Sequence, residues 1–212
     1  MKKFNTISRK SGFTLAEILL AMMVFAIAIT TILALLSRTL EQTDSVLVKD
    51  EAINLSSAVD NFMSEIPFTT AYQAVVNQPN SHLFAYQYRA EVNGSGVLVP
   101  YPTVQPGDQV GVDYEVVTGV RWPGDVAELA AEVAALDGRL FKVYLEVSEA
   151  NPLGNTGLDS DPNTVSGSPA VLSYDSAVLV VFAEMYAVPS TEFPLVRTEV
   201  TPDFSFNFAV SR

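Results

Sequence analysis

The sequence predicts an α+β protein in which one long N-terminal helix carries a β-rich domain. Three observations support this fold class. The segment from residue 13 to residue 36 is apolar apart from one charged residue, Glu17, and it contains neither Pro nor Gly. A helical pattern of apolar residues continues to Ile66, and segments that alternate apolar and polar residues follow it. We therefore expect a membrane-spanning first half of the helix, an amphipathic second half, and a mainly antiparallel sheet with one short extra helix.

The apolar segment is long enough to cross a membrane. Its 24 residues rise about 1.5 Å each in a helix, which spans a hydrocarbon core of about 30 Å. A secretory signal peptide has an apolar core of only about 7 to 15 residues with a small-residue cleavage site after it, whereas Gly12 precedes this segment. A plain single-pass anchor explains the length, but it gives no role to Gly12 or Glu17.

The residues around the start of this segment form a specific pattern. Residues 9–17 read Arg-Lys-Ser-Gly-Phe-Thr-Leu-Ala-Glu, so that Glu17 is the fifth residue of the apolar segment. This pattern resembles the type III signal of type IV pilins and type II secretion pseudopilins. The resemblance implies that a prepilin peptidase cleaves between Gly12 and Phe13 and methylates the new amine of Phe13. It also implies assembly with other pilin or pseudopilin subunits through residues 13–66.

Glu17 is a predicted assembly residue. A carboxylate inside a membrane helix costs about 2.5 to 3.5 kcal/mol on insertion scales, and it usually marks a partner or a function. After cleavage, the amine of Phe13 would supply a cation one helical turn away, in the same subunit or in a neighbour. The alternative is that Glu17 lies close enough to the cytoplasmic interface for its side chain to reach water.

The charge distribution predicts the orientation in the membrane. The chain has a net charge of -12, with 12 basic and 24 acidic residues. Four of the basic residues, Lys2, Lys3, Arg9 and Lys10, precede Phe13, so the remainder has eight basic against 24 acidic residues, a net of -16. The positive-inside rule then places the N-terminus in the cytoplasm and the C-terminal domain in the periplasm or outside the cell. An acidic domain also argues against binding nucleic acid.

The first proline marks the expected end of the helix. Pro67 is poorly tolerated inside a helix and disfavours helical geometry in Ile66. The apolar stripe expected to face the sheet consists of Leu40, Leu47, Ile53, Val59, Phe62, Met63 and Ile66. The predicted organisation is a basic leader at 1–12 that is removed, a transmembrane and assembly helix at 13–36, its amphipathic continuation at 37–66, and an extracytoplasmic β-rich domain at 67–212.

Alternating patterns predict most strands of the domain, and a run that is apolar on both faces predicts a central strand at 177–187. The expected strands are 84–92, 97–99, 112–120, 141–147, 177–187 and 204–208. A short helix at 126–136 is expected between the third and fourth of them, opened by a capping box of Asp125 and Glu128 and stopped by Gly138. The acidic residues of this helix region, Glu128, Glu132 and Asp137, are expected to form a solvated face.

Few residues suggest chemistry. Asp159, Asp161 and Asn163 place oxygen side chains at alternate positions of the polar loop 151–169, as a calcium site does. The loop lacks the Gly-containing turn and the bidentate Glu of an EF-hand, so a solvated surface loop is the alternative reading. The chain has no Cys, which rules out a disulfide, and its one histidine, His82, is not part of any recognisable catalytic motif. No cofactor other than calcium is suggested.

These observations favour a non-enzymatic structural subunit. It would lie in inner-membrane lipid as a single-pass protein before assembly and afterwards in a type II secretion pseudopilus or a type IV pilus. The acidic domain, the lack of a disulfide and the elaborated C-terminal region favour a minor component. The alternatives are a pilus-tip adhesin or substrate-binding subunit that uses loop 151–169, and an anchored enzyme, for which the sequence offers no constellation of residues.

Overall fold

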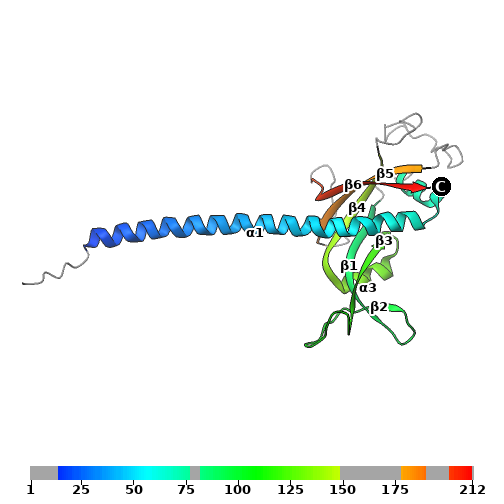
Figure 1. The fold of residues 1–212 in the computed structure, drawn as a ribbon, viewed down its shortest axis with the longest axis horizontal. Coiled ribbons are helices and arrows are strands. Elements are labelled where there is room, and N and C mark those ends of the chain that lie inside the picture. The colour runs from blue at the N-terminus through cyan, green and yellow to red at the C-terminus, as the bar shows by residue number, and fades with distance from the viewer. Residues whose placement is uncertain (1–13, 77–81, 149–177, 190–200, 212) are drawn as a thin grey trace, which may run out of the picture. The chain divides into compact units, whose positions relative to one another are not determined.

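The computed structural model describes residues 14–76, 82–148, 178–189 and 201–211. The chain divides into two compact units, Met1–Ser45 and Val46–Arg212. Helix α1 (Leu15–Glu65) begins in the first unit and ends in the second (Figure 1). The predicted end of the helix just before Pro67 is confirmed, and so is the α+β fold class.

In the first unit, every described side chain is exposed. Helix α1 is long and apolar enough to cross a membrane. Two of its polar residues bond back into the helix: the hydroxyl of Thr30 donates to the carbonyl of Ile27 at 2.9 Å, and the hydroxyl of Thr31 donates to the same carbonyl at 2.8 Å. These bonds satisfy hydroxyl groups that would otherwise be costly in lipid.

In the second unit, α1 buries one face against the sheet. The buried residues recur every three or four positions and are Val48, Ala52, Leu55, Val59 and Met63. The predicted stripe was right for Val59 and Met63, which are buried, and for Phe62 and Ile66, which pack partly buried against the core, but it was wrong for Leu40, Leu47 and Ile53, which are 62%, 52% and 51% exposed. The small side chain of Ala52 lies on the contact face instead. The residues that contact the sheet are decided by their angular position around the helix, and not by the size of their side chains.

Six antiparallel strands form one sheet (Figure 1). The strands are β1 (His82–Val92), β2 (Leu98–Pro100), β3 (Glu115–Arg121), β4 (Leu136–Val147), β5 (Val178–Val188) and β6 (Phe204–Ser211). Their order is β2-β1-β4-β5-β6, and β3 also pairs with β1. The mainly antiparallel sheet expected from the sequence is therefore present.

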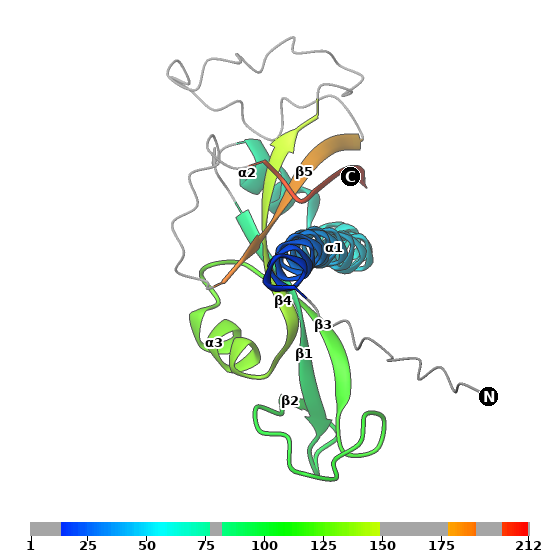
Figure 2. The ribbon, with the colours of Figure 1, turned by 90° about the vertical axis from the view of Figure 1, so that its left-hand side faces the viewer.

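Both faces of the sheet are covered by helices. In the second unit, α1 and α3 (Val126–Ala134) lie on opposite sides of the sheet (Figure 2). Leu83 and Ala85 of β1 pack in the cluster that contains the buried face of α1, whereas Phe84 and Tyr86 pack with Leu129 of α3. The alternating pattern of β1 therefore separates two buried faces, and not a buried face from a solvated one.

A second short helix, α2 (Phe68–Val76), was not predicted. It follows Pro67 directly, and the carbonyl of Pro67 accepts hydrogen bonds from the backbone N–H groups of Thr70 and Ala71 at 2.8 and 3.1 Å. Proline is favourable in the first turn of a helix, because the N–H it lacks would have no partner there. Pro67 therefore ends α1 and also begins α2, whose Tyr72 is 1% exposed in the core.

The start of α3 is predicted correctly, but the capping predicted for it is not observed. The side chain of Asp125 makes no capping hydrogen bond, so the predicted capping box is absent. Helix α3 ends at Ala134, and Gly138 lies inside β4 with φ 95°, where the β1–β4 register shifts. Gly138 therefore serves a strand irregularity and does not stop the helix.

Strand β3 is shorter than predicted at its start. Residues 111–113 form a turn, which Tyr114 closes through an isolated bridge to Val110, and the side chain of Asp113 accepts a hydrogen bond from the backbone N–H of Gln109 at 2.8 Å. Gly111 takes φ 80° in the same turn. This local bonding competes with the strand pattern of Val112 and Tyr114, and β3 begins only at Glu115.

Candidate assembly site

The N-terminus of α1 is closed by a capping box. Thr14 precedes the first helical residue, and its hydroxyl accepts a hydrogen bond from the backbone N–H of Glu17 at 3.3 Å. In return, Oε2 of Glu17 accepts hydrogen bonds from the backbone N–H of Thr14 at 2.8 Å and from its hydroxyl at 2.9 Å. This arrangement satisfies N–H groups that a helix start leaves without partners.

The capping box gives Glu17 a role that sequence reasoning missed. The signal was present, because a threonine three residues before a glutamate at the start of an apolar run is the sequence signature of this motif. Both hydrogen bonds that Glu17 accepts within the described part of the chain use Oε2, and its Oε1 accepts none there. Glu17 can therefore cap its own helix and still offer one oxygen to a cation.

The residues of the predicted cleavage site, Gly12 and Phe13, lie outside the described residues. The structure therefore does not test the cleavage, the methylation or the pairing of Glu17 with the amine of Phe13. The side chains of residues 18–29, which follow Glu17 on the helix, are all apolar and exposed, with Phe25 at 67%. Such a surface is suited to lipid or to other apolar helices.

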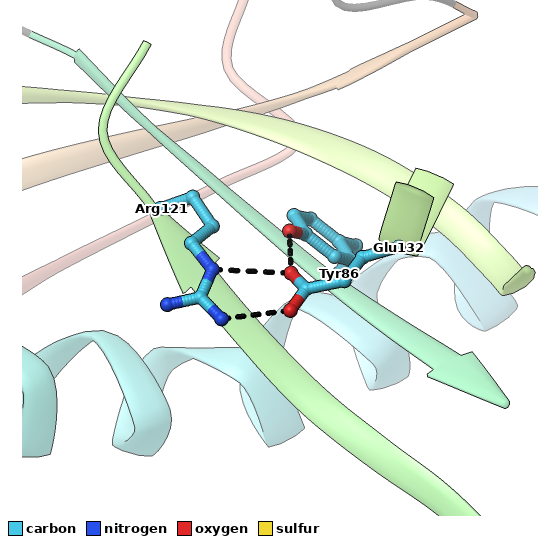
Figure 3. A network of polar contacts seen from close by, with 3 residues as sticks. All are labelled: Tyr86, Arg121 and Glu132. Atoms are coloured by element: carbon cyan, nitrogen blue, oxygen red, sulfur yellow. Dashed lines mark hydrogen bonds and ion pairs between the residues drawn. The ribbon is translucent and has the colours of Figure 1, made fainter. Parts of the chain in front are cut away.

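A buried polar network joins α3 to the sheet (Figure 3). Glu132 of α3 is 5% exposed, and Arg121 of β3 donates to both of its oxygens, from Nε at 3.1 Å and from a terminal nitrogen at 2.7 Å. The hydroxyl of Tyr86 on β1 donates to Oε2 of the same carboxylate at 2.5 Å. The expected solvated position of Glu132 was wrong, although Glu128 and Asp137 are exposed as expected.

The network shifts the pKa values of Glu132 and Tyr86. Burial alone would raise the pKa of Glu132, but the hydrogen bonds from Arg121 and Tyr86 outweigh burial and lower it below the ordinary value. Burial and the bond to Glu132 raise the pKa of Tyr86 above its ordinary value. Glu132 is therefore ionised and Tyr86 is neutral near neutral pH, which keeps both hydrogen bonds in place.

The close approach of β3 to Tyr86 requires a glycine. Gly119 is the residue opposite Tyr86 in the β1–β3 register. A Cβ atom at Gly119 would lie 2.7 Å from Cε2 of the Tyr86 ring. Glycine therefore leaves the space in which the buried ring lies and from which its hydroxyl reaches Glu132.

The other candidate chemistry has no assembled site in the described residues. His82 packs between the rings of Phe84 and Tyr144, with ring centroids at 5.3 and 5.6 Å. Asp159, Asp161 and Asn163 lie outside the described residues, so the calcium hypothesis is untested. Across the part of the chain that the structure describes, no group of three or more His, Cys, Asp or Glu side chains could hold a metal ion.

The helix and the domain together define the class of the protein. One apolar N-terminal helix with a capped start is long enough to cross a membrane, and this helix continues into the core of an α+β domain. A family model described as the prokaryotic N-terminal methylation motif matches residues 7–35, and this motif is the signature of type IV pilins and pseudopilins. No curated protein and no solved structure matches the chain.

The match confirms the resemblance seen in residues 9–17. The motif implies processing by a prepilin peptidase and assembly with other pilins, and it supports a pilin-like role in general. Proteins with this motif are structural subunits rather than catalysts. The match covers residues 7–12 of the predicted leader and almost all of the predicted membrane segment, so the domain from residue 46 onward is understood from its own structure.

Proposed function

We propose that the protein is a structural subunit of a type II secretion pseudopilus or a type IV pilus. It is cleaved between Gly12 and Phe13, methylated at Phe13, and assembled through residues 13–66. The observation that carries this proposal is the methylation motif at residues 7–35, which ends within an exposed apolar helix. We further propose that the N-terminus faces the cytoplasm and that the domain lies in the periplasm before assembly.

The position within the filament is part of the proposal. The acidic domain, the absence of Cys and the elaborated C-terminal region favour a minor component over the main repeating subunit. A net charge of -16 outside the leader would make copies repel one another if they surrounded each other on every side. The composition therefore supports a filament in which this chain contacts other subunits as well.

The proposed contact for assembly joins Glu17 to a subunit's N-terminal amine. Oε2 of Glu17 is used by the capping box, and the remaining oxygen is available for a charged partner. A hydrogen bond to a charged group contributes about 1.5 to 3 kcal/mol, which corresponds to roughly a ten- to hundredfold change in an equilibrium. Pairing in lipid would also offset the cost of placing a carboxylate there.

The capping box makes a direct test possible. Glu17→Gln removes the charge but retains an oxygen that can cap Thr14, because glutamine also occupies this position of a capping box. We expect Glu17→Gln to insert and to be cleaved normally, while its filament yield falls by about tenfold or more. The measurement compares sheared filaments with the membrane-bound pool by immunoblot.

Two further variants complete this test. Glu17→Ala removes both the cap and the charge, so it should lose at least as much filament as Glu17→Gln. Thr14→Val keeps the charge and weakens the cap, and it should assemble better than Glu17→Gln. If Glu17→Gln forms filaments as well as the natural chain, the proposed charge pairing is wrong and capping alone explains Glu17.

A further inference from the structure

Strand β3 presents an open edge. In the part of the chain that the structure describes, β3 pairs only with β1. Arg89 of β1 donates its backbone N–H to Ala135 at 2.9 Å and accepts from the N–H of Tyr101 at 2.8 Å, so its backbone groups point away from β3. The alternation of an antiparallel pair then directs the backbone N–H and C=O groups of the opposite residue, Val116, to the outer edge of β3.

The same alternation places Thr118 and Val120 at the outer edge. No hydrogen bond from the backbone of these residues to another described residue occurs outside the ladder. The pairing of β3 with β1 runs without a register shift from Glu115 to Arg121. Between these two charged ends, the five residues carry no charge and no proline. Charges, prolines and bulges are what natural proteins use to block an edge strand, so the outer edge of β3 is competent to accept another strand.

A groove lies beside this edge. It has a volume of about 430 Å³ and lies between β3 and the C-terminal half of α1. Its helix side is formed by Ala58, Asn61, Phe62 and Glu65, which share one face because of their spacing. Its strand side is formed by residues 118–121. The groove therefore combines apolar and polar side chains next to unpaired backbone groups.

The charged residues at the groove indicate which kind of peptide segment fits there. Arg121 already bonds to Glu132 through two of its nitrogens, whereas Glu65 is exposed and makes no ion pair with any described residue. Residues 90–120 contain four acidic residues and no basic one. An extended segment with a lysine or arginine near Glu65 and an apolar side chain toward Phe62 fits this charge and shape.

We infer that the outer edge of β3 and the groove beside it bind an extended segment of the adjacent subunit in the filament. The segment adds as a strand, with backbone hydrogen bonds to Val116, Thr118 and Val120 and with alternate side chains in the groove. In strand addition the main-chain bonds provide affinity, while the pockets for alternate side chains provide specificity. The inference rests on the proposed function, because it requires a filament that supplies the neighbour.

Residue-resolved hydrogen exchange tests the inference directly. The full chain is compared as membrane-extracted subunits in detergent and as sheared filaments. We expect the amides of Val116, Thr118 and Val120 to exchange rapidly in the subunit and to slow by at least about tenfold in the filament. The amides of Val117 and Gly119 bond to β1 and should be slow in both samples, which provides an internal control.

A pair of variants at one position provides the second test. Thr118→Pro removes an outward N–H without removing a bond to β1, and proline is tolerated at a strand edge. We expect about a tenfold loss of filament. Thr118→Val retains the N–H and the β-branched shape, and it should assemble normally. Thermal unfolding of both variants checks that the domain is folded. If Thr118→Pro does not fold, the exchange experiment on the natural chain decides whether β3 accepts a strand.

The outcomes separate the two proposals. Filaments in which the three outward amides remain as exposed as in the subunit would overturn strand addition and leave the proposed function intact. Protection that appears only when a secreted cargo protein is added would also overturn it, because the occupant would then be cargo and not a subunit. If no filament forms in cells that assemble such filaments, the proposed function fails and the edge contact fails with it.

Discussion

Two carboxylates, Glu17 at the start of α1 and Glu132 in α3, each accept hydrogen bonds from two or more polar groups. Glu17 caps the start of α1 through Oε2 and, in our proposal, pairs with an amine in lipid. Glu132 accepts hydrogen bonds from Arg121 and Tyr86 and so connects α3 to β3 and β1. In our proposal the pairing of Glu17 serves assembly, whereas the contacts of Glu132 stabilise one domain.

Removing the charge of Glu132 should destabilise the domain. Glu132→Ala leaves the buried hydroxyl of Tyr86 without its acceptor and removes the partner of Arg121. We expect a loss of about 1 to 3 kcal/mol in the free energy of unfolding, measured by denaturant titration. Glu128→Ala on the exposed side of the same helix is the matched control and should change it by less than about 0.5 kcal/mol.

The same residue predicts a pH dependence. The folded-state pKa of Glu132 is lowered, so its contribution is fully present above the unfolded value, about 4.3, and is lost as the pH falls through the folded pKa. The difference in unfolding free energy between the natural chain and Glu132→Gln should therefore shrink as the pH falls below about 4.3. A difference that is constant from pH 7 to pH 3 would show that the charge of Glu132 contributes nothing.

Sequence reasoning could have found the burial of Glu132 only in part. Leu129, Glu132 and Ala135 are spaced by three residues, which places them on one side of the chain as it passes through α3. All three are buried. Nothing in the spacing indicates, however, that Arg121 and Tyr86 would be brought to the same point, because that depends on the pairing of β1 with β3.

At the scale of elements, the buried face of α1 differs from the apolar stripe that the sequence predicts. Leu55 is 2% exposed and packs in the core, whereas neighbouring Ile53 is 51% exposed. Leu55→Ala should lower the free energy of unfolding by about 2 to 5 kcal/mol, because it leaves a cavity under the helix.

Ile53→Ala is the control for this prediction, since it removes a side chain of similar size from the exposed face. It should change the unfolding free energy by less than about 0.5 kcal/mol in the isolated subunit. Denaturant titration of both variants in the same detergent gives the comparison. A loss for Ile53→Ala as large as that for Leu55→Ala would contradict the exposed position of Ile53.

The elements that the sequence predicts well are those with long, regular patterns. The apolar period of α1, the alternation of β1, β4 and β6 and the run of β5 that is apolar on both faces identify these elements, and Pro67 indicates the end of α1, whereas most strand ends differ by one to several residues. Helix α2 was missed because Pro67 signals both the end of one helix and the start of another. The sequence pattern alone does not reveal that Asp125 makes no capping hydrogen bond. Nor does it reveal that a turn around Gly111 replaces the expected start of a strand.

At the scale of the whole molecule, one apolar helix and one acidic domain are joined in a single chain. The methylation motif covers residues 7–35, while the domain from residue 46 onward has two buried faces and an open strand edge. A subunit of this kind would use its helix for anchoring and assembly and its domain for contact with neighbours. Both proposals depend on the chain being processed at the junction of leader and helix.

The most direct measurement is therefore mass spectrometry of the N-terminus after expression with a prepilin peptidase. The account predicts a chain of residues 13–212 that begins with Phe13 and carries one added methyl group on its amine. The natural chain expressed without the peptidase is the control and should retain residues 1–12. A chain that still begins at Met1 in the presence of the peptidase, or one that is cut near residue 36, would contradict the account.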